Sequence, residues 1–166
     1  MAAGATYEPI ATQTLASAAA SITFSSIAAS WTDLRLVFLP IATASLSVWT
    51  TFNGDTATNY SYTNIYGDGT AAASARSTSR ANILLSQNAI ATSQYPLLSM
   101  DVFSYAGSTY KTVLTTASQD NNGSGISANT IQLWRSTAAI TSITLTTSTS
   151  TFAIGTTATL YGIKAA

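Results

Sequence analysis

Apolar and polar residues alternate along much of this chain with a period of two, which is typical of β-strands with one buried face. The clearest examples are residues 46–52 (LSVWTTF) and 95–105 (YPLLSMDVFSY), where every second side chain would point to the same face. Residues 34–39 (LRLVFL) are almost continuously apolar, as expected for a strand in the middle of a sandwich. No segment has a convincing helical period, so the pattern predicts an all-β fold.

Turn residues divide the chain into about ten expected strands. Pro9 marks residues 7–15 as an edge strand, because proline has no N–H to offer a second neighbour. Residues 95–105 and 110–116 form the clearest expected hairpin. The other expected strands are residues 21–27, 34–39, 46–52, 81–87, 131–135, 140–146 and 157–164. Short strands separated by turns predict an antiparallel β-sandwich.

Two stretches are expected to be loops. Residues 70–79 are small and polar, so we expect a loop there, with edge pairing as the alternative. Residues 119–129 (QDNNGSGISAN) are rich in turn-forming residues and are the clearest expected loop.

The stretch at residues 52–69 (FNGDTATNYSYTNIYGDG) concentrates tyrosines between two turn signals. Asn53 and Gly54 tolerate the positive φ angles of a tight hairpin turn. Tyr60 and Tyr62 alternate with small polar residues, so both rings are expected to project from one face of an extended segment. We therefore expect a ledge of tyrosines here.

The composition indicates a weakly charged, folded domain. Charged residues make up 7% of the chain, against about 25% in typical soluble domains, whereas apolar residues make up an ordinary 46%. The length fits one domain, residues 1–166, in which residues 1–15 are either a free N-terminal arm or an edge strand, paired or exchanged between copies. Short Ser and Thr side chains lose little entropy when fixed, which favours burial of the surface in a larger assembly.

The charge pattern argues against nucleic acid and membranes as partners. The net charge is zero, and the nearest approach to a basic cluster is Arg76 with Arg80, which is too few cations for many phosphates. The N-terminal residues lack a basic region followed by an apolar run, so we expect no signal peptide. The most apolar window, residues 34–44, is too short to cross a bilayer.

The sequence offers little material for catalysis. It contains no histidine and no cysteine, so the usual nucleophile–base pairs and zinc sites are missing. A glycosidase would need two carboxylates facing each other across a sugar, whereas the six acids are scattered and are expected at turns and strand ends. We therefore expect no enzyme and no cofactor.

Calcium is harder to dismiss, because two loops carry several oxygen ligands. These are residues 120–122 (DNN) and the pair Asn53 and Asp55. Neither matches the twelve-residue calcium loop, and Asp-Asn-Asn-Gly is an ordinary turn sequence. We predict no metal site and leave open whether a loop carboxylate binds calcium.

Aromatic side chains are the best candidates for contacts with a ligand or a partner. Exposed tyrosine and tryptophan rings bury much area at little entropic cost. The candidates for an interface or ligand contact are Tyr60, Tyr62, Tyr66 and Trp49. The alternative for each ring is packing in the core or between subunits, and we favour packing for Trp134, which lies beside Leu133 in an apolar strand.

Three segments resemble a group of small virion proteins of tailed bacteriophages. These segments are the tyrosine stretch at residues 52–69, SMDVFSYAGSTYKTVLT at residues 99–115 and LWRSTAAITSITLTTSTSTFAIGTTATLYGIKAA at residues 133–166. The resemblance covers about two thirds of the chain and is most specific in its C-terminal third, whereas the first fifty residues match less well. Such modules occur as head decoration (cement) proteins and at the distal ends of tail fibres. The resemblance implies a jelly-roll-like sandwich and a trimer, and it transfers no active-site residues.

Two functions are therefore expected. The first is a structural one: a homotrimeric decoration protein on the capsid exterior that binds the major capsid protein and braces the shell. The alternative is a receptor-binding tip of a tail fibre, whose tyrosines hold a glycan of the host surface.

Overall fold

The chain folds into twelve strands, and its regular structure is entirely β in the computed structural model, which describes residues 6–42, 44, 46–86, 95–120 and 122–164. The strands are β1 (Tyr7–Thr14), β2 (Ser21–Phe24), β3 (Asp33–Leu39), β4 (Val48–Phe52), β5 (Tyr60–Gly67), β6 (Ala72–Arg80), β7 (Ile83–Ser86), β8 (Leu97–Val102), β9 (Lys111–Gln119), β10 (Ile126–Trp134), β11 (Ile143–Thr147) and β12 (Thr157–Ile163). The all-β prediction is confirmed, with twelve strands in place of about ten.

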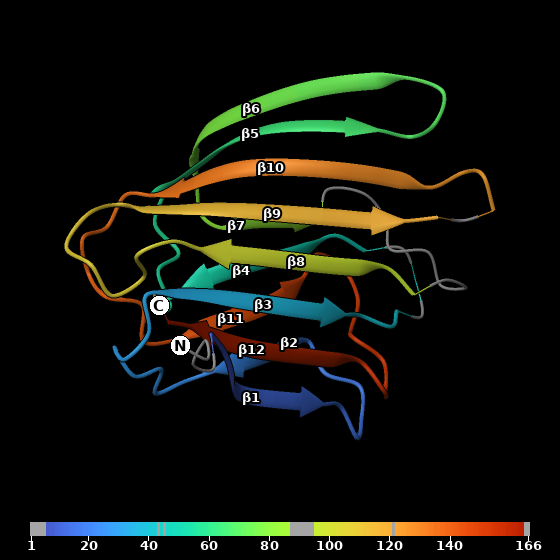
Figure 1. The fold of residues 1–166 in the computed structure, drawn as a ribbon. Coiled ribbons are helices and arrows are strands. Elements are labelled where there is room, and N and C mark those ends of the chain that lie inside the picture. The colour runs from blue at the N-terminus through green and yellow to red at the C-terminus, as the bar shows by residue number, and fades with distance from the viewer. Residues whose placement is uncertain (1–5, 43, 45, 87–94, 121, 165–166) are drawn as a thin grey trace.

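The strands form two antiparallel sheets packed as a sandwich (Figure 1). The larger sheet has eight strands in the order β1-β12-β3-β8-β9-β10-β5-β6, and the smaller has four in the order β2-β11-β4-β7. In Figure 1 the larger sheet faces the viewer and the smaller one lies behind it. The strand β7 contacts β8, β9, β10 and β5, so the smaller sheet ends beneath β5 and leaves β6 beyond its edge.

The strand order is that of a jelly roll with two inserted hairpins. Without the β5–β6 and β9–β10 hairpins, the sheets read β1-β12-β3-β8 and β2-β11-β4-β7. The first strand then pairs with the last, the second with the last but one, and so inward, as in a long hairpin rolled up on itself. The two inserted hairpins add four strands to one side of the first sheet.

Two expected loops are partly strands. Residues 72–80 form the edge strand β6 and pair with β5, so the edge-pairing alternative for residues 70–79 is confirmed and the loop expected there is wrong. The strand β10 begins at Ile126, inside the second expected loop, and pairs with both β9 and β5. The reason is the same in both places. Backbone hydrogen bonds hold these segments, whereas most side chains of β6 and of residues 126–129 are small or polar and give no strand pattern.

The core lies between the two sheets and follows the predicted alternation. Burial alternates along β3 and β12, with Leu34, Leu36 and Leu160 fully buried and their neighbours partly exposed. The loops add large rings as well, since Phe152 packs edge-on against Phe38 with ring centroids 5.2 Å apart. Each fully buried aliphatic or aromatic side chain of this kind contributes about 1.5–3 kcal/mol.

A buried glutamine joins the two sheets at β7. The side chain of Gln132 on β10 is 2% exposed, and its Oε1 accepts a hydrogen bond of 2.7 Å from the N–H of Leu84. Its Nε2 donates to the carbonyl of Leu84 at 2.6 Å and to Oγ1 of Thr115 at 3.0 Å. The hydroxyl of Thr115 donates to the same carbonyl at 3.1 Å. The amide thus takes the place of a neighbouring strand at the free edge of β7.

The N-terminal strand β1 is a paired edge strand of the larger sheet. It pairs with β12 of the same chain, from Tyr7 opposite Ile163 to Thr14 opposite Thr157, with a bulge between Pro9 and Ala11. This bears out the paired-strand alternative for residues 7–14, and residues 1–5 lie outside the described part of the chain.

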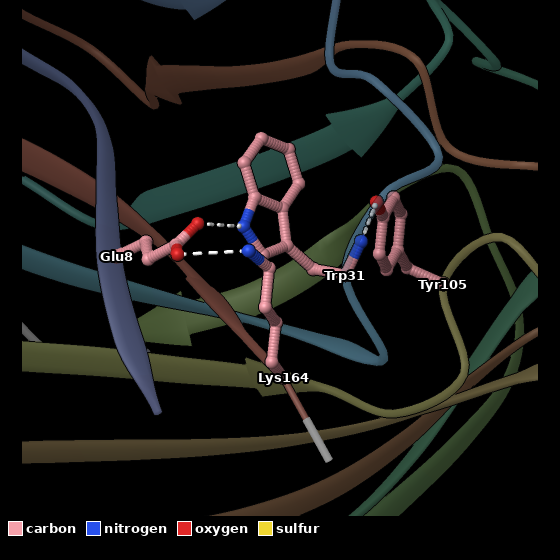
Figure 2. A network of polar contacts seen from close by, with 4 residues as sticks. All are labelled: Glu8, Trp31, Tyr105 and Lys164. Carbon is pink, nitrogen blue, oxygen red and sulfur yellow. Dashed lines mark hydrogen bonds and ion pairs between the residues drawn. The ribbon is translucent and has the colours of Figure 1, made fainter. Parts of the chain in front are cut away.

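A polar clasp fastens β1 to the end of β12 (Figure 2). The carboxylate of Glu8 accepts a hydrogen bond of 3.0 Å from Nε1 of Trp31 and pairs with Nζ of Lys164 at 2.8 Å. The indole of Trp31 lies directly on Gly162, where an added Cβ would come within 2.3 Å of the ring. Glycine at this position therefore lets the indole lie flat against the backbone of β12 and reach Glu8.

Replacing Gln132 with alanine is expected to lower the free energy of unfolding by about 2–4 kcal/mol, because the buried N–H of Leu84 loses its partner and the carbonyl of Leu84 keeps only the hydroxyl of Thr115. Chemical denaturation measures this loss. Gln13→Ala is the matched control, since the exposed Gln13 also caps an edge carbonyl, that of Thr23 at 2.6 Å. We expect the control to lose less than about 1 kcal/mol, and equal losses in the two variants would contradict the role of Gln132.

The clasp is expected to weaken in acid. Hydrogen bonds from Lys164 and Trp31 lower the pKa of Glu8 below its ordinary value of 4.5, so its contribution to stability is present above that pH and is lost as the pH falls through the lowered pKa. Denaturation midpoints of the wild type and Glu8→Gln, measured between pH 6 and pH 2.5, should differ at pH 6 and converge in acid. A difference that does not change with pH would show that the carboxylate charge is not what holds β1.

Candidate functional site

The four aromatic candidates do not form one patch. Tyr60, Tyr62 and Tyr66 lie on β5 and share the face that looks toward the smaller sheet, as expected from their spacing. Trp49 lies on β4 between the buried Val48 and Thr50, so its half-buried ring is on the outer face of the smaller sheet. The tyrosine ledge and Trp49 therefore belong to different surfaces.

Tyr60 is a core residue and offers no surface to a ligand. Its side chain is fully buried, and its ring stacks on Trp134 with a centroid distance of 6.3 Å and an interplanar angle of 15°. The hydroxyl accepts a hydrogen bond from the N–H of Phe52 and donates one to the carbonyl of Asp55, both at 3.1 Å. Burial raises the pKa of Tyr60 to about 12. The expected surface contact is corrected here, because Phe52 at the end of β4 and the turn at Asp55 cover this end of β5.

The turn after β4 is held by Asp55. Asn53 and Gly54 adopt the predicted positive φ angles, 52° and 67°, but the expected hairpin is wrong, because β4 belongs to the smaller sheet and β5 to the larger one. The carboxylate of Asp55 then accepts hydrogen bonds from Nε1 of Trp134 at 2.7 Å, from Nδ2 of Asn59 at 3.0 Å and from the N–H of Ala57 at 2.9 Å. Burial pushes the pKa of Asp55 upward, but these hydrogen bonds outweigh it and the net shift is downward. Trp134 packs in the core, at 2% exposure.

Tyr62 and Tyr66 are only half-buried. The guanidinium carbon of Arg80 lies 5.9 Å from the centroid of the Tyr62 ring, within reach of a cation–π contact. Tyr66 packs against the margin of the core. Of the three tyrosines, these two keep accessible surface, at the overhanging end of the larger sheet.

One open surface that the sequence did not predict is the outer face of the eight-stranded sheet. No strand covers this face in the described ranges (Figure 1). Several of its apolar side chains are 40–66% exposed, namely Leu39, Ile65, Leu97, Phe103 and Ile131. The sequence does contain one indication of this face, because residues 95–105 are apolar on both sides of the expected strand. A strand covered by other elements on both sides would have the same pattern, so the pattern does not show that one side is exposed.

Charge is sparse on this outer face. Arg35 and Asp101 are cross-strand neighbours and form an ion pair of 3.4 Å. Burial raises the pKa of Asp101, and the charge of Arg35 opposes that shift. Hydroxyls bridge other strands, as between Thr12 and Thr159 at 3.1 Å. The face is therefore apolar and hydroxyl-rich, with few charges to desolvate on contact.

A shallow hollow of about 270 Å³ lies near the β6 side of the larger sheet. Its lining comes from β5, β6, β9 and β10 and includes Thr63, Arg76, Thr112, Ile131 and Leu133. By strand register these side chains belong to the outer face. The hollow offers one cation, several hydroxyls and an apolar floor.

The described carboxylates serve turns and ion pairs. Hydrogen bonds from the N–H of Ala71 and from Thr70 lower the pKa of Asp68 to about 2. Asp33 accepts a hydrogen bond from the N–H of Ser104, and Asp120 accepts one from the N–H of Gly123. These contacts match the expectation that the acids sit at turns and strand ends.

The two oxygen-rich loops use their oxygens for hydrogen bonds within the chain. Oδ1 of Asn53 accepts hydrogen bonds from Thr141 and from the N–H of Ser142, and Asp55 is engaged as described above. In the other loop, Asn121 lies outside the described residues. The described ranges hold no group of three or more His, Cys, Asp or Glu side chains placed to bind a metal.

Comparison of the chain with protein-family models, with curated proteins and with solved structures finds no match. In the ranges that the structure describes, no helix has the length and apolarity needed to span a membrane.

The different roles of the tyrosines can be tested by removing their hydroxyls. Tyr60→Phe should lower the free energy of unfolding by about 1–3 kcal/mol, because the buried N–H of Phe52 loses its acceptor. Tyr66→Phe keeps the half-buried ring at the margin of the core and should change stability by less than about 0.5 kcal/mol. Urea denaturation of both variants compares them directly. A Tyr60→Phe protein as stable as the wild type would contradict the assigned role.

Proposed function

We propose that this protein is a structural component of a tailed-bacteriophage particle, namely a homotrimeric decoration protein that binds the major capsid protein on the outside of the head. It acts by surface contact and makes or breaks no covalent bond. The sequence resemblance of residues 52–69, 99–115 and 133–166 supports this proposal, and the jelly-roll topology agrees with what that resemblance implies.

The observation that carries the proposal is the open, weakly charged outer face of the larger sheet. Eight strands spaced by about 4.8 Å, each with about eight residues of about 3.3 Å, span roughly 900 Å². That area is about what one partner contributes to a standard protein–protein interface. Ile65 and Ile131 lie 66% and 61% exposed on neighbouring strands in its β5–β10 half. Covering them removes apolar surface from water without stripping water from many charges.

A bracing function follows from the physics of such contacts. A sheet face held by backbone ladders changes little on binding, so little conformational entropy is lost. Many small contacts then add to the work needed to separate adjacent capsid subunits.

The hollow beside Arg76 favours a second candidate, a receptor-binding tip of a tail fibre. Its hydroxyls and cation are groups that hydrogen-bond a host glycan, and its volume of about 270 Å³ suits a small sugar. Under this candidate the protein lies at the tail, and the half-buried Tyr62 and Tyr66 lie on the other face of β5 from the hollow.

The two candidates are separated by binding assays on the purified protein. A decoration protein should bind undecorated heads and raise their melting temperature, whereas a fibre tip should label host cells and bind a glycan array. Binding to cells without binding to heads would overturn the decoration proposal in favour of the tip. Binding to neither would overturn both.

The outer face should be required for head binding. Ile131→Glu places a charge in its centre and should reduce the affinity for heads at least tenfold, because that charge would have to be desolvated. Ser21→Glu adds the same charge to an exposed site on the smaller sheet and should bind like the wild type. Equal binding by both variants would remove the outer face from the interface.

A further inference from the structure

Three of the four sheet edges are closed by specific features. At β1, the N–H of Lys164 donates a hydrogen bond to the carbonyl of Thr6. Because hydrogen-bonded pairs alternate along an antiparallel ladder, this bond shows which residues of β1 bond to β12 and which point their backbone groups away from it. Pro9 then stands at a position whose backbone points away from β12, and a bulge follows it. A proline at such a position denies an incoming strand one of its donors.

The two edges of the smaller sheet are capped by glutamines from the larger sheet. Gln13 on β1 donates to the carbonyl of Thr23 on β2 at 2.6 Å. Gln132 on β10 satisfies both backbone groups of Leu84 on β7. Both caps place a side-chain amide where a further strand would bind.

The fourth edge, β6, carries no such feature along residues 72–76. The β5–β6 turn is closed by a hydrogen bond from the N–H of Asp68 to the carbonyl of Ala71 at 3.3 Å. Because bonded pairs alternate in an antiparallel ladder, Ala73 and Ala75 bond to β5. The N–H and carbonyl groups of Ala72, Ser74 and Arg76 therefore point outward, and all three residues are exposed. The chain is regular here, since the bulge and the positive φ of 60° at Ser79 come later.

We propose that this edge is a strand-addition site, which takes an extended polypeptide segment antiparallel to residues 72–76 of β6. Three outward N–H groups alternate with three outward carbonyls, so a segment of five to seven residues can complete the ladder. Alanine and serine side chains leave the approach unobstructed.

The charge of β6 selects the chemistry of the partner. The strand contains Arg76 and Arg80 and no acidic residue. Arg76 lies in the exposed run, on the face with the hollow. A carboxylate at the directly opposite position of the added strand pairs with Arg76 and fixes the register. The site therefore takes an acidic extended segment, and it stands independently of the outer-face interface and of any role in a virion.

The first measurement is amide hydrogen exchange on the free protein. The N–H groups of Ala72, Ser74 and Arg76 should exchange rapidly, and those of Ala73 and Ala75 slowly. Protection of the first three in the monomeric free protein would mean that the edge is already covered and would overturn the proposal.

The second measurement uses the peptide acetyl-TVTETVT-amide as a probe. At a concentration ten times its Kd, the peptide should slow exchange of Ala72, Ser74 and Arg76 about tenfold, with little change at Ala73 and Ala75. The same peptide with glutamine in place of glutamate should bind two- to fivefold more weakly, and Arg76→Gln should abolish this preference. No binding of the acidic peptide at 10 mM, or protection confined to other strands, would overturn the proposal.

Two controls separate edge pairing from general adhesion. Ser74→Pro removes an outward N–H without removing a bond to β5, and it should weaken binding at least tenfold relative to Ser74→Ala. A peptide N-methylated at alternate residues tests the unaltered protein in the same way and should not bind. Equal binding by the proline and alanine variants, with the N-methylated peptide also bound, would overturn strand addition.

Discussion

The sandwich depends on the hydrogen bonds by which Gln132 joins its two sheets. The strand β7 is the edge of the smaller sheet and packs under the middle of the larger one, where water cannot reach its free backbone groups. An unpaired amide and carbonyl in that position would each oppose folding by about 1–3 kcal/mol. The Gln132 amide and the Thr115 hydroxyl satisfy them, so that the two sheets close over a dry core.

Much of the fold could be predicted from side-chain pattern, because burial imposes that pattern. The apolar run of β3 and the hairpin of β8 and β9 lie where alternation and turn residues place them. Pro9 marked the edge strand, and Asn53-Gly54 marked a turn with positive φ. The strand β6 was predicted only as the alternative to a loop, because its ladder depends on the backbone, while its side chains lie mostly in solvent and carry no periodic signal.

The candidate site was harder to predict, because exposure is decided by the partner sheet. Spacing correctly placed Tyr60 and Tyr62 on one face of β5, but it could not show that Phe52 and the turn at Asp55 bury the first of them and leave the second half-exposed. The exposed Ile65 and Ile131 look like core residues in the sequence. Tertiary packing decides whether an apolar strand is covered on one side or on both, and a single sequence does not show which.

The pairing of the first strand with the last has a consequence for biosynthesis. Tyr7 can meet Ile163 only after the residues between them have left the ribosome, so the eight-stranded sheet is completed late in the synthesis of this domain. A topology with such distant partners has high contact order and belongs among slow-folding proteins, whose nascent strands stay exposed for longer. Chaperone dependence during expression is therefore an expected property of this jelly roll.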